Sequence, residues 1–251
     1  MINVLVCGIG GKMGGNIVDL LKNDEQAKVV CGVDLHSPEN CGVPVYPSFG
    51  QVKEKVDVII DFSSPAVLES ELEYAVTHNV PAVLASTGYI AEQLEAIDKA
   101  AEKTAIFKTA NFSLGVNLLV ELVKKAAETL GESFDIEIVE KHHSLKADAP
   151  SGTALMLADA ANSVFGGEKP YVNGRSGIVG KRGKEIGIHA VRGGTIVGEH
   201  DVLFCGEDEI ITLSHSARSK RVFAVGAIKA AKWLAGKPAG KYDMNSLLKD
   251  I

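Results

Sequence analysis

The run of residues 140–154 holds the side chains best suited to chemistry in this chain. His142 and His143 are adjacent, and imidazole is the side chain best matched to proton transfer near neutral pH. Neighbouring residues of a strand point to opposite faces, so both histidines can serve one ligand only where the strand gives way to a loop. Lys146 adds a cation or proton donor close by. The run therefore predicts a proton-transfer site at the end of a strand.

The same run contains a helix start at Ser151. Serine is a favoured N-cap residue, and the first N–H groups of a helix have no partner within the helix. The amides of Gly152 and Thr153 in this first turn predict an anion site that suits a carboxylate. A pair of histidines alone is usually a surface or core feature. Together with Lys146 and the capped turn, the pair favours catalysis.

A glycine-rich turn near the N-terminus predicts a second anion site. Gly8-Ile9-Gly10-Gly11-Lys12-Met13-Gly14 follows the apolar run Ile2–Cys7 and precedes apolar residues at helical spacing. Glycines at these positions permit a tight turn, close approach of the backbone to a pyrophosphate, and close helix packing. The alternative is a turn that merely needs a positive φ. The position directly after the first strand favours the nucleotide site.

Asp34 ends the second apolar run, residues 28–33, where a dinucleotide-binding domain carries the acidic residue that binds the ribose hydroxyls. A 2′-phosphate would meet this like charge at a cost of roughly 1 to 4 kcal/mol at about 4 Å. Lys12 in the glycine turn offsets part of this repulsion. The sequence therefore favours NADH and leaves NADPH open, and the alternative for Asp34 is an ordinary turn residue.

The first half of the chain alternates strand-like and helix-like segments. This alternation predicts a doubly wound parallel sheet of the Rossmann type, with helices on both faces. Ligands of such sheets bind at the carboxyl ends of the strands, where the polar and glycine residues of this half stand. The expected strands are residues 2–7, 28–33, 56–60, 81–85 and 105–108.

The second half of the chain predicts an α+β layer. Helices are expected at residues 114–130, 151–165 and 224–234, and a strand at 134–140. Extended segments at 185–192, 195–204 and 209–214, separated by turns, predict an antiparallel meander.

We therefore expect two domains. Residues 1–112, joined by a C-terminal helical segment at about 222–251, form a dinucleotide-binding domain. Residues 113–221 form an α+β domain with a mixed or antiparallel sheet that binds substrate and mediates oligomerisation.

Composition narrows the class of protein. The 251 residues are 46% hydrophobic and 23% charged, which is typical of a globular protein. The net charge of −6 argues against a nucleic-acid partner, and the basic run 181–184 is interpreted as a solvated loop. Four dispersed cysteines without paired spacing indicate a reducing compartment and no metal site. We expect no signal peptide, no membrane span and a cytoplasmic location.

With these motifs in place, the chain resembles the dihydrodipicolinate reductases, also called 4-hydroxy-tetrahydrodipicolinate reductases. The pattern His142-His143-x-x-Lys146-x-Asp-Ala-Pro-Ser-Gly-Thr-Ala is highly specific to this family, and the resemblance covers nearly the whole chain. The other segments that carry it are the glycine turn, Asp61-Phe62-Ser63, Ser86-Thr87-Gly88, Asn111-Phe112-Ser113, Val197-Gly198-Glu199-His200, and Phe223-Ala224 with Gly226-Ala227.

The resemblance implies that NADH or NADPH reduces a cyclic imine dicarboxylate to tetrahydrodipicolinate in lysine and diaminopimelate synthesis. It implies that His142 donates and accepts the proton, that Lys146 is a proton donor, and that the protein is a homotetramer built through the sheet of the second domain. The residues implied to hold substrate are His143, Ser151, Gly152 and Thr153. Those implied to hold the dinucleotide are Gly8, Ile9, Gly10, Gly11, Lys12, Met13, Asp34, Ala85, Ser86, Thr87, Thr109, Ala110, Asn111 and Phe112.

Three positions depart from the family pattern and concern cofactor preference. Lys12 stands where the family often has arginine, Leu35 follows Asp34 where an NADP-preferring member can have arginine, and Ala85 replaces a usual glycine.

Two other functions are compatible with part of the sequence. The first is a reductase of another imine or of an amino-acid semialdehyde, which would leave the run 142–153 unexplained. The second is a non-catalytic NAD(H) sensor that regulates a partner, although no DNA-binding helix or basic stripe is apparent.

Overall fold

The computed structural model describes residues 1–36 and 41–250. This part of the chain forms two compact units, each with a sheet and a core of its own. Unit 1 consists of Met1–Ser113 and the C-terminal segment from Arg221, and unit 2 of Leu114–Lys220. Residue 251, the end of the expected C-terminal segment, lies outside the described residues.

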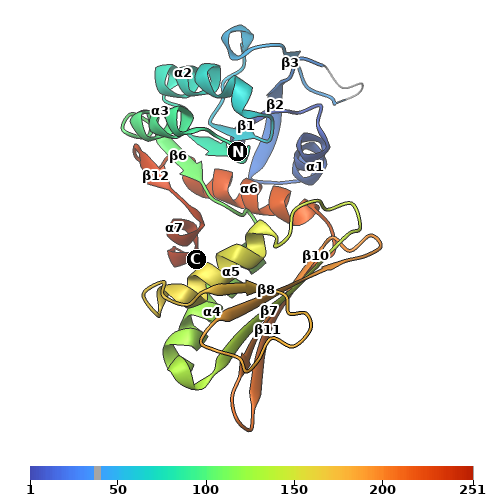
Figure 1. Ribbon diagram of the computed structural model, residues 1–251. Coiled ribbons are helices and arrows are strands. Elements are labelled where there is room, and N and C mark those ends of the chain that lie inside the picture. Colours follow the sequence, from blue (N-terminus) through green and yellow to red (C-terminus); the bar gives the residue numbers. More distant parts are fainter. Residues whose placement is uncertain (37–40, 251) are drawn as a thin grey trace. The chain divides into compact units, whose positions relative to one another are not determined.

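Unit 1 is built on a seven-stranded sheet with the order β12-β6-β5-β4-β1-β2-β3, in which every pair is parallel. This confirms the doubly wound sheet of the Rossmann type. Helices α2 (Leu68–His78) and α3 (Ala91–Ala101) cover one face, and α1 (Lys12–Leu21) and α6 (Arg221–Leu234) cover the other (Figure 1). Central residues such as Leu5 and Ile59 are fully buried, because both faces are covered. The strands are β1 (Ile2–Cys7), β2 (Ala27–Val33), β3 (Val45–Tyr46), β4 (Val58–Asp61), β5 (Ala82–Leu84), β6 (Ala105–Lys108) and β12 (Gly240–Tyr242).

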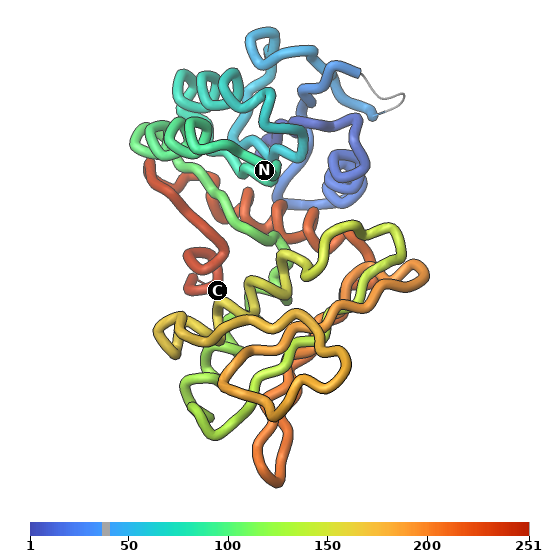
Figure 2. Tube along the Cα trace, viewed as in Figure 1, coloured from blue at the N-terminus to red at the C-terminus, as the bar shows by residue number. Residues whose placement is uncertain are grey.

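The sequence did not predict the short elements at the margins of this unit. Strands β3 and β12 have two and three residues, too few for a hydrophobic period to appear. Figure 2 shows the C-terminal segment running beside β6, with which β12 pairs. Helix α7 (Met244–Lys249) follows, and the side chain of Asp243 caps it by accepting the N–H of Ser246. Single turns of 3₁₀ helix lie at Phe49–Gln51 and Pro65–Val67.

Unit 2 contains a mixed five-stranded sheet with the order β11-β10-β7-β9-β8. Helices α4 (Leu114–Leu130) and α5 (Gly152–Ser163) pack together, and they form a core with the buried side chains of the sheet. A turn of 3₁₀ helix, Gly131–Ser133, connects α4 to β7. The strands are β7 (Asp135–His142), β8 (Tyr171–Asn173), β9 (Ile186–Arg192), β10 (Gly198–Cys205) and β11 (Ile210–Ala217).

The expected antiparallel meander is wrong for its first pair. Of the three strands expected to form the meander, only β10 and β11 are neighbours; β7 lies between β9 and β10, antiparallel to β10 and parallel to β9. The chain leaves β7, forms α5 and the short edge strand β8, and then returns as β9 beside β7; such a crossover makes strands parallel. The connection after β9 then passes the end of β7: Gly193 N–H donates to the His142 carbonyl, and Ser144 N–H to that of Gly194. The glycines that resembled a hairpin turn instead bring this connection to the end of β7.

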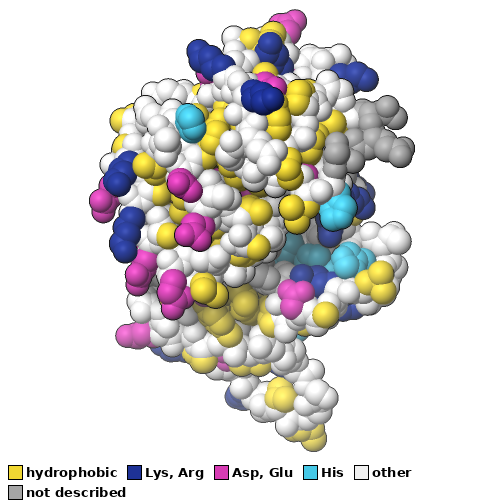
Figure 3. Space-filling model, turned by 90° about the horizontal axis from the view of Figure 1, so that it is seen from above, with side chains coloured by type: hydrophobic (Ala, Val, Ile, Leu, Met, Phe, Trp, Pro, Cys, Tyr) yellow, Lys and Arg dark blue, Asp and Glu magenta, His cyan; other side chains and the backbone are white. Residues whose placement is uncertain are grey.

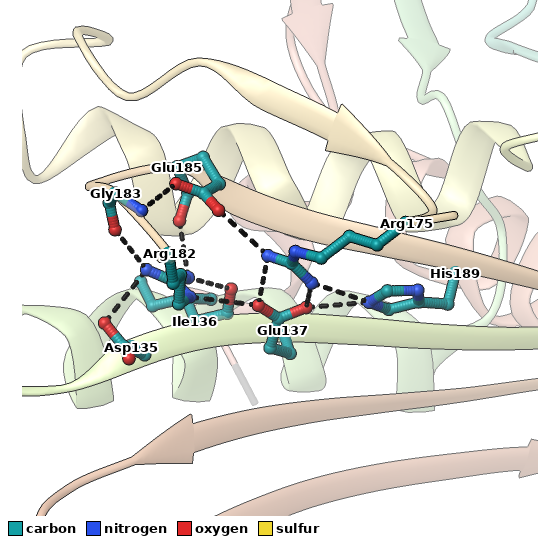
Figure 4. A network of polar contacts seen from close by, with 8 residues as sticks. All are labelled: Asp135, Ile136, Glu137, Arg175, Arg182, Gly183, Glu185 and His189. Carbon is teal, nitrogen blue, oxygen red and sulfur yellow. Dashed lines mark hydrogen bonds and ion pairs between the residues drawn. The ribbon is translucent and has the colours of Figure 1, made fainter. Parts of the chain in front are cut away.

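The basic run 181–184 is an exposed loop, as expected, except at Arg182. Arg182 is about four-fifths buried, and its Nη1 and Nε donate to Asp135 and Glu137 at 2.9 and 3.0 Å. Arg175 and His189 donate to the same Glu137 carboxylate (Figure 4). Acidic residues on the outward positions of β7 therefore hold the loop that carries the arginines, a long-range pairing that the loop sequence alone does not reveal.

Candidate functional site

The glycine turn of unit 1 joins β1 to α1 and is packed tightly against its neighbours. Gly8 has a φ of +77°, a conformation that glycine adopts without steric cost, and its N–H donates to the Val33 carbonyl at 2.9 Å. A Cβ on Gly14 would lie 2.3 Å from the Gly8 carbonyl oxygen. Gly11 is the N-cap of α1, and no side chain caps this helix. Its first amides are therefore not engaged by a cap and suit an anion.

Asp34 follows β2 and holds the glycine turn from the side. Its Oδ2 accepts the N–H of Gly10 at 2.9 Å, and its Oδ1 accepts the N–H of His36 at 3.0 Å. A Cβ on Gly10 would lie 2.9 Å from the His36 carbonyl oxygen and 3.0 Å from Oδ2, so a side chain here would force its neighbours to shift. A cavity of about 510 Å³ opens here, lined by residues that include Gly8, Gly11 and Asp34. The glycine turn, the uncapped helix start and this cavity fit the adenosine and pyrophosphate parts of a dinucleotide.

The other expected cofactor segments follow β5 and β6 at the same carboxyl edge of the sheet. Ser86 is buried, and its Oγ has no partner among the described residues. Phe112 is buried between the rings of Phe62 and Phe107, with centroid distances of 6.0 and 5.9 Å. None of the residues 85–87 and 109–112 lines the cavity beside Asp34. The structure thus places these segments at the expected edge but not around that cavity.

His142 is the last residue of β7, and a buried carboxylate holds its ring. Nδ1 of His142 lies 2.7 Å from Oε2 of Glu140, two residues earlier on the same face of the strand. The side chain of Glu140 is 0% exposed and that of His142 11%. On another side of the ring, Nε2 lies 3.1 Å from the position of a Cβ on Gly198. The ring is therefore confined between Glu140 and the start of β10.

Arg192, the last residue of β9, neutralises this buried carboxylate. Its Nη1 and Nη2 each lie 2.7 Å from one oxygen of Glu140, and the N–H of Ser151 donates to Oε1 at 3.0 Å. Burial raises the pKa of Glu140, but the hydrogen bonds from Arg192, His142 and Ser151 outweigh it and lower the pKa below its usual value. Glu140 is therefore an anion at neutral pH although it has no exposed surface.

Ser151 is the N-cap of α5, as the sequence predicted. Its Oγ accepts the N–H of Ala154 at 3.2 Å and lies 3.1 Å from Nε2 of His200. The His200 ring meets the His142 ring edge-on, with centroids 5.2 Å apart. Burial and then the neighbouring His142 lower the pKa of His200 to about 4, so this histidine is neutral near pH 7. A neutral imidazole and a helix start therefore flank Ser151.

The remaining expected site residues lie around this centre. Nζ of Lys146 is 2.8 Å from both carboxylate oxygens of Asp148. The backbone N–H of Lys146 donates to the His143 carbonyl. Nδ1 of His143 is buried without a partner among the described residues. Gly152 and Thr153 form the first turn of α5. Glu140 therefore ties His142 to Ser151, whereas Lys146 is paired with Asp148.

Sequence reasoning assigned no role to Glu140, Arg192 or His200. One signal was present: Ile136 and Ile138 occupy the buried face of β7, and the same alternation places Glu140 at the next buried position. A charge at such a position needs a partner. The partner could not be named, because Arg192 comes from a strand that the expected meander placed elsewhere.

Among the described residues, no group of three or more His, Cys, Asp or Glu side chains could hold a metal ion. Within the described ranges, no helix combines the length and the apolar character that crossing a membrane requires. On the face of the molecule in Figure 3, acidic and basic side chains are interspersed.

Comparison with known proteins assigns both units to one family. A family model described as the N-terminus of dihydrodipicolinate reductase matches residues 2–112, and one described as its C-terminus matches residues 115–248. A 4-hydroxy-tetrahydrodipicolinate reductase of Caldanaerobacter subterraneus subsp. tengcongensis is 49% identical over 250 residues, 99% of either chain. One of Clostridium novyi is 43% identical over 249 residues, also 99% of either chain.

Solved structures give the same assignment. A dipicolinate-bound dihydrodipicolinate reductase from Paenisporosarcina sp. TG-14 superposes with a TM-score of 0.82 at 28% identity, over 98% of this chain and 99% of that one. An aspartate dehydrogenase from Thermotoga maritima, 17% identical, shares the fold with a TM-score of 0.53, over 94% of this chain and 98% of that one. The chain therefore belongs to the dihydrodipicolinate reductase family and is an oxidoreductase of lysine and diaminopimelate synthesis.

Proposed function

We propose that the chain reduces 4-hydroxy-tetrahydrodipicolinate to tetrahydrodipicolinate with NADH or NADPH: a hydride and a proton are added, and the 4-hydroxyl group leaves as water. The observation that carries the proposal is the centre in unit 2, where a histidine fixed by a buried carboxylate lies beside the capped start of α5. A proton donor next to a carboxylate-binding helix start suits a cyclic imine dicarboxylate. The name of the substrate comes from the relatives that match this chain end to end.

The dinucleotide is assigned to unit 1. When bound, its dihydronicotinamide supplies the hydride. The glycine turn and the first amides of α1 hold the pyrophosphate, and Asp34 accepts hydrogen bonds from the adenine ribose hydroxyls. Both oxygens of Asp34 already accept one backbone N–H each, which orients the carboxylate before a ligand arrives. The negative charge of Asp34 repels a 2′-phosphate and therefore favours NADH over NADPH.

Residues of unit 2 hold the substrate and move the proton. His142 exchanges the proton at the reduced ring, and Lys146 stabilises the negative charge that develops there and is a second donor. Ser151, with the amides of Gly152 and Thr153, grips one carboxylate at the start of α5, and His143 contacts the same ligand. The ion pair of Lys146 with Asp148 must give way when Lys146 turns to the substrate.

These residue roles give each unit a function. Residues 1–112 with about 222–251 bind the dinucleotide, and residues 113–221 bind substrate and assemble a homotetramer through the sheet of unit 2. The cytoplasm is the compartment that suits a biosynthetic reductase with four free thiols. We assign no nucleic acid, membrane or metal partner.

The decisive experiment follows oxidation of NADH and of NADPH by absorbance, with and without freshly generated 4-hydroxy-tetrahydrodipicolinate. Substrate-dependent oxidation of either cofactor supports the proposal, and the ratio of kcat/KM values gives the preference. Tight NADH binding without turnover would favour a sensor, and turnover only with another imine would favour a different reductase.

A further inference from the structure

We infer that Glu140 is a positioning residue that fixes the proton of the His142 ring on Nδ1 and sets the spacing between His142 and the start of α5. The inference rests on the proposed role of His142 as the proton donor. It concerns a residue to which neither the sequence motif nor the proposed function assigns a task.

The carboxylate of Glu140 is fully buried and receives four donors. Oε2 accepts from Nδ1 of His142 and from Nη1 of Arg192, both at 2.7 Å. Oε1 accepts from Nη2 of Arg192 at 2.7 Å and from the N–H of Ser151 at 3.0 Å. A carboxylate has about four acceptor positions. Each oxygen is therefore engaged twice, and rotation of the group would break several hydrogen bonds at once.

Arg192 keeps this group ionised. A lone carboxylate without exposed surface would take up a proton, whereas a two-pronged guanidinium contact favours the anion. Arg192 is itself held, since its Nη2 also donates to the Asp148 carbonyl at 2.7 Å. Glu140 thus acts only as an acceptor toward the imidazole.

The state of the His142 ring follows from this. An ionised carboxylate 2.7 Å away requires a donor at Nδ1, so the neutral ring carries its hydrogen there. Nε2 is then the atom that takes up and releases the catalytic proton. The neighbouring ring of His200 is neutral at pH 7 and does not repel the charged form of His142.

Glu140 also fixes the distance between His142 and the start of α5. His142 ends β7, and Ser151 begins α5 after a loop of eight residues. Without a common partner this loop would let the proton donor and the carboxylate grip move independently. The two oxygens of Glu140 bind one group each, so both groups share one rigid reference. A shift of about 1 Å between such groups is enough to slow catalysis strongly.

The test compares Glu140→Gln with the control Glu137→Gln, on the outward face of the same strand. Side-chain ¹⁵N NMR of the histidines reports which ring nitrogen carries the hydrogen, and the spectrum of His142→Gln assigns the His142 signals. In the wild type we expect the neutral ring to be protonated at Nδ1. In Glu140→Gln we expect a mixture of tautomers and a kcat that is roughly 10²- to 10⁴-fold lower, with NADH affinity unchanged. Glu137→Gln should change neither quantity.

The outcomes separate this inference from the proposed function. A wild-type ring protonated at Nε2 overturns the inference without any variant, so a variant that fails to fold does not block the test. A low kcat in Glu140→Gln with an unchanged tautomer also overturns it, since the role is then only structural. Absence of turnover in the wild type would instead reject the proposed substrate and leave the NMR result standing.

Discussion

His142 and His200 lie side by side, with ring centroids 5.2 Å apart, yet their surroundings differ. His200 is 4% exposed, and burial followed by the adjacent His142 lowers its pKa to about 4. His142 instead donates to the anion Glu140. Two neighbouring rings cannot both carry a charge at low cost. His200 is therefore neutral near pH 7, and we assign the proton exchange to His142, whose ring the Glu140 anion holds.

Replacing His142 by glutamine should remove this exchange. We expect kcat to fall by roughly 10²- to 10⁴-fold, the usual contribution of a positioned acid or base, while NADH affinity stays the same because we assign the cofactor to unit 1. Steady-state kinetics and fluorescence titration with NADH measure the two effects. His189→Gln, on the outward face of β9, is the matched control. Full turnover in His142→Gln would remove this residue from the mechanism.

Asp34 allows a second test at the level of one side chain. Asp34→Asn retains one acceptor oxygen, enough for only one of the N–H groups of Gly10 and His36, and removes the charge that opposes a 2′-phosphate. We expect the ratio of the NADPH Kd to the NADH Kd to fall by roughly one to three orders of magnitude, given the charge effect of roughly 1 to 4 kcal/mol. Titration of both cofactors gives the ratio, and Asp34→Ala tests the lost hydrogen bonds in addition. Equal losses for both cofactors would contradict the ribose role.

At the scale of elements, the sequence predicted those features that depend on residues close to one another in the chain. The strand Ile2–Cys7, the glycine turn and the N-cap Ser151 depend on residues close in sequence, and the structure has them where they were expected. The expected pairing of β9 with β10 was wrong, because glycines that form hairpin turns also occur in loops that cross from one strand to a distant one. The partner of Glu140 could not be found for the same reason, since Arg192 reaches it only through the parallel pairing of β7 and β9.

Gly198, the first residue of β10, lies close to the ring of His142 and allows a test of how tightly this ring is held. A Cβ there would lie 3.1 Å from Nε2 of His142, closer than most such contacts, so Gly198→Ala should displace the ring by a few tenths of an ångström. We expect kcat to fall by about tenfold or more, because proton transfer depends steeply on geometry. Gly193→Ala, in the preceding loop, meets nothing within 4 Å and should behave as the wild type.

The two glycine variants can be compared directly, because each adds one methyl group and the two positions are five residues apart, Gly193 in the loop before β10 and Gly198 at its first residue. Thermal unfolding checks that the stability of Gly198→Ala is close to that of Gly193→Ala. Equal kcat values for the two variants would mean that the His142 ring moves freely at this position, contrary to the confinement seen here.

At the scale of the whole molecule, the two units have separate cores and only one of them contains tryptophan. Trp233, the single tryptophan of the chain, lies in α6 of unit 1 and contacts Phe107 and Tyr242 edge-on. Its fluorescence therefore follows the unfolding of unit 1, whereas far-UV circular dichroism follows both units. Stability effects can thus be assigned to one unit.

The units also contain carboxyl groups with opposite pKa shifts. In unit 1, Glu71 and Asp61 are 0% exposed, and both oxygens of Glu71 lack a hydrogen-bond partner among the described residues. Burial, and then the charge of Asp61, raises the pKa of Glu71 well above its usual value. In unit 2, burial raises the pKa of Glu137, but hydrogen bonds from Arg175, His189 and then Arg182 outweigh this and lower it to about 2.

These shifts predict opposite pH dependences. The contribution of Glu71 to stability is complete below the unfolded-state pKa, near 4.5, and is lost as pH rises through the raised pKa of the folded state. That of Glu137 is complete above 4.5 and is lost as pH falls toward about 2. Alkaline conditions therefore weaken unit 1 through Glu71, and acid weakens unit 2 through Glu137.

Glu71→Gln should remove the alkaline loss, because a neutral amide needs no proton to stay buried. In the wild type this loss has a limiting slope of about 1.4 kcal/mol per pH unit for one proton. We expect urea unfolding followed by Trp233 fluorescence to show a flatter decline for Glu71→Gln as the pH rises above the unfolded-state pKa near 4.5. Glu137→Gln is the control: it should leave this decline unchanged and reduce the acid sensitivity of the transition seen by circular dichroism. If Glu71→Gln declines as steeply as the wild type, Glu71 does not hold a proton in the folded state, and the alkaline weakening of unit 1 has another origin.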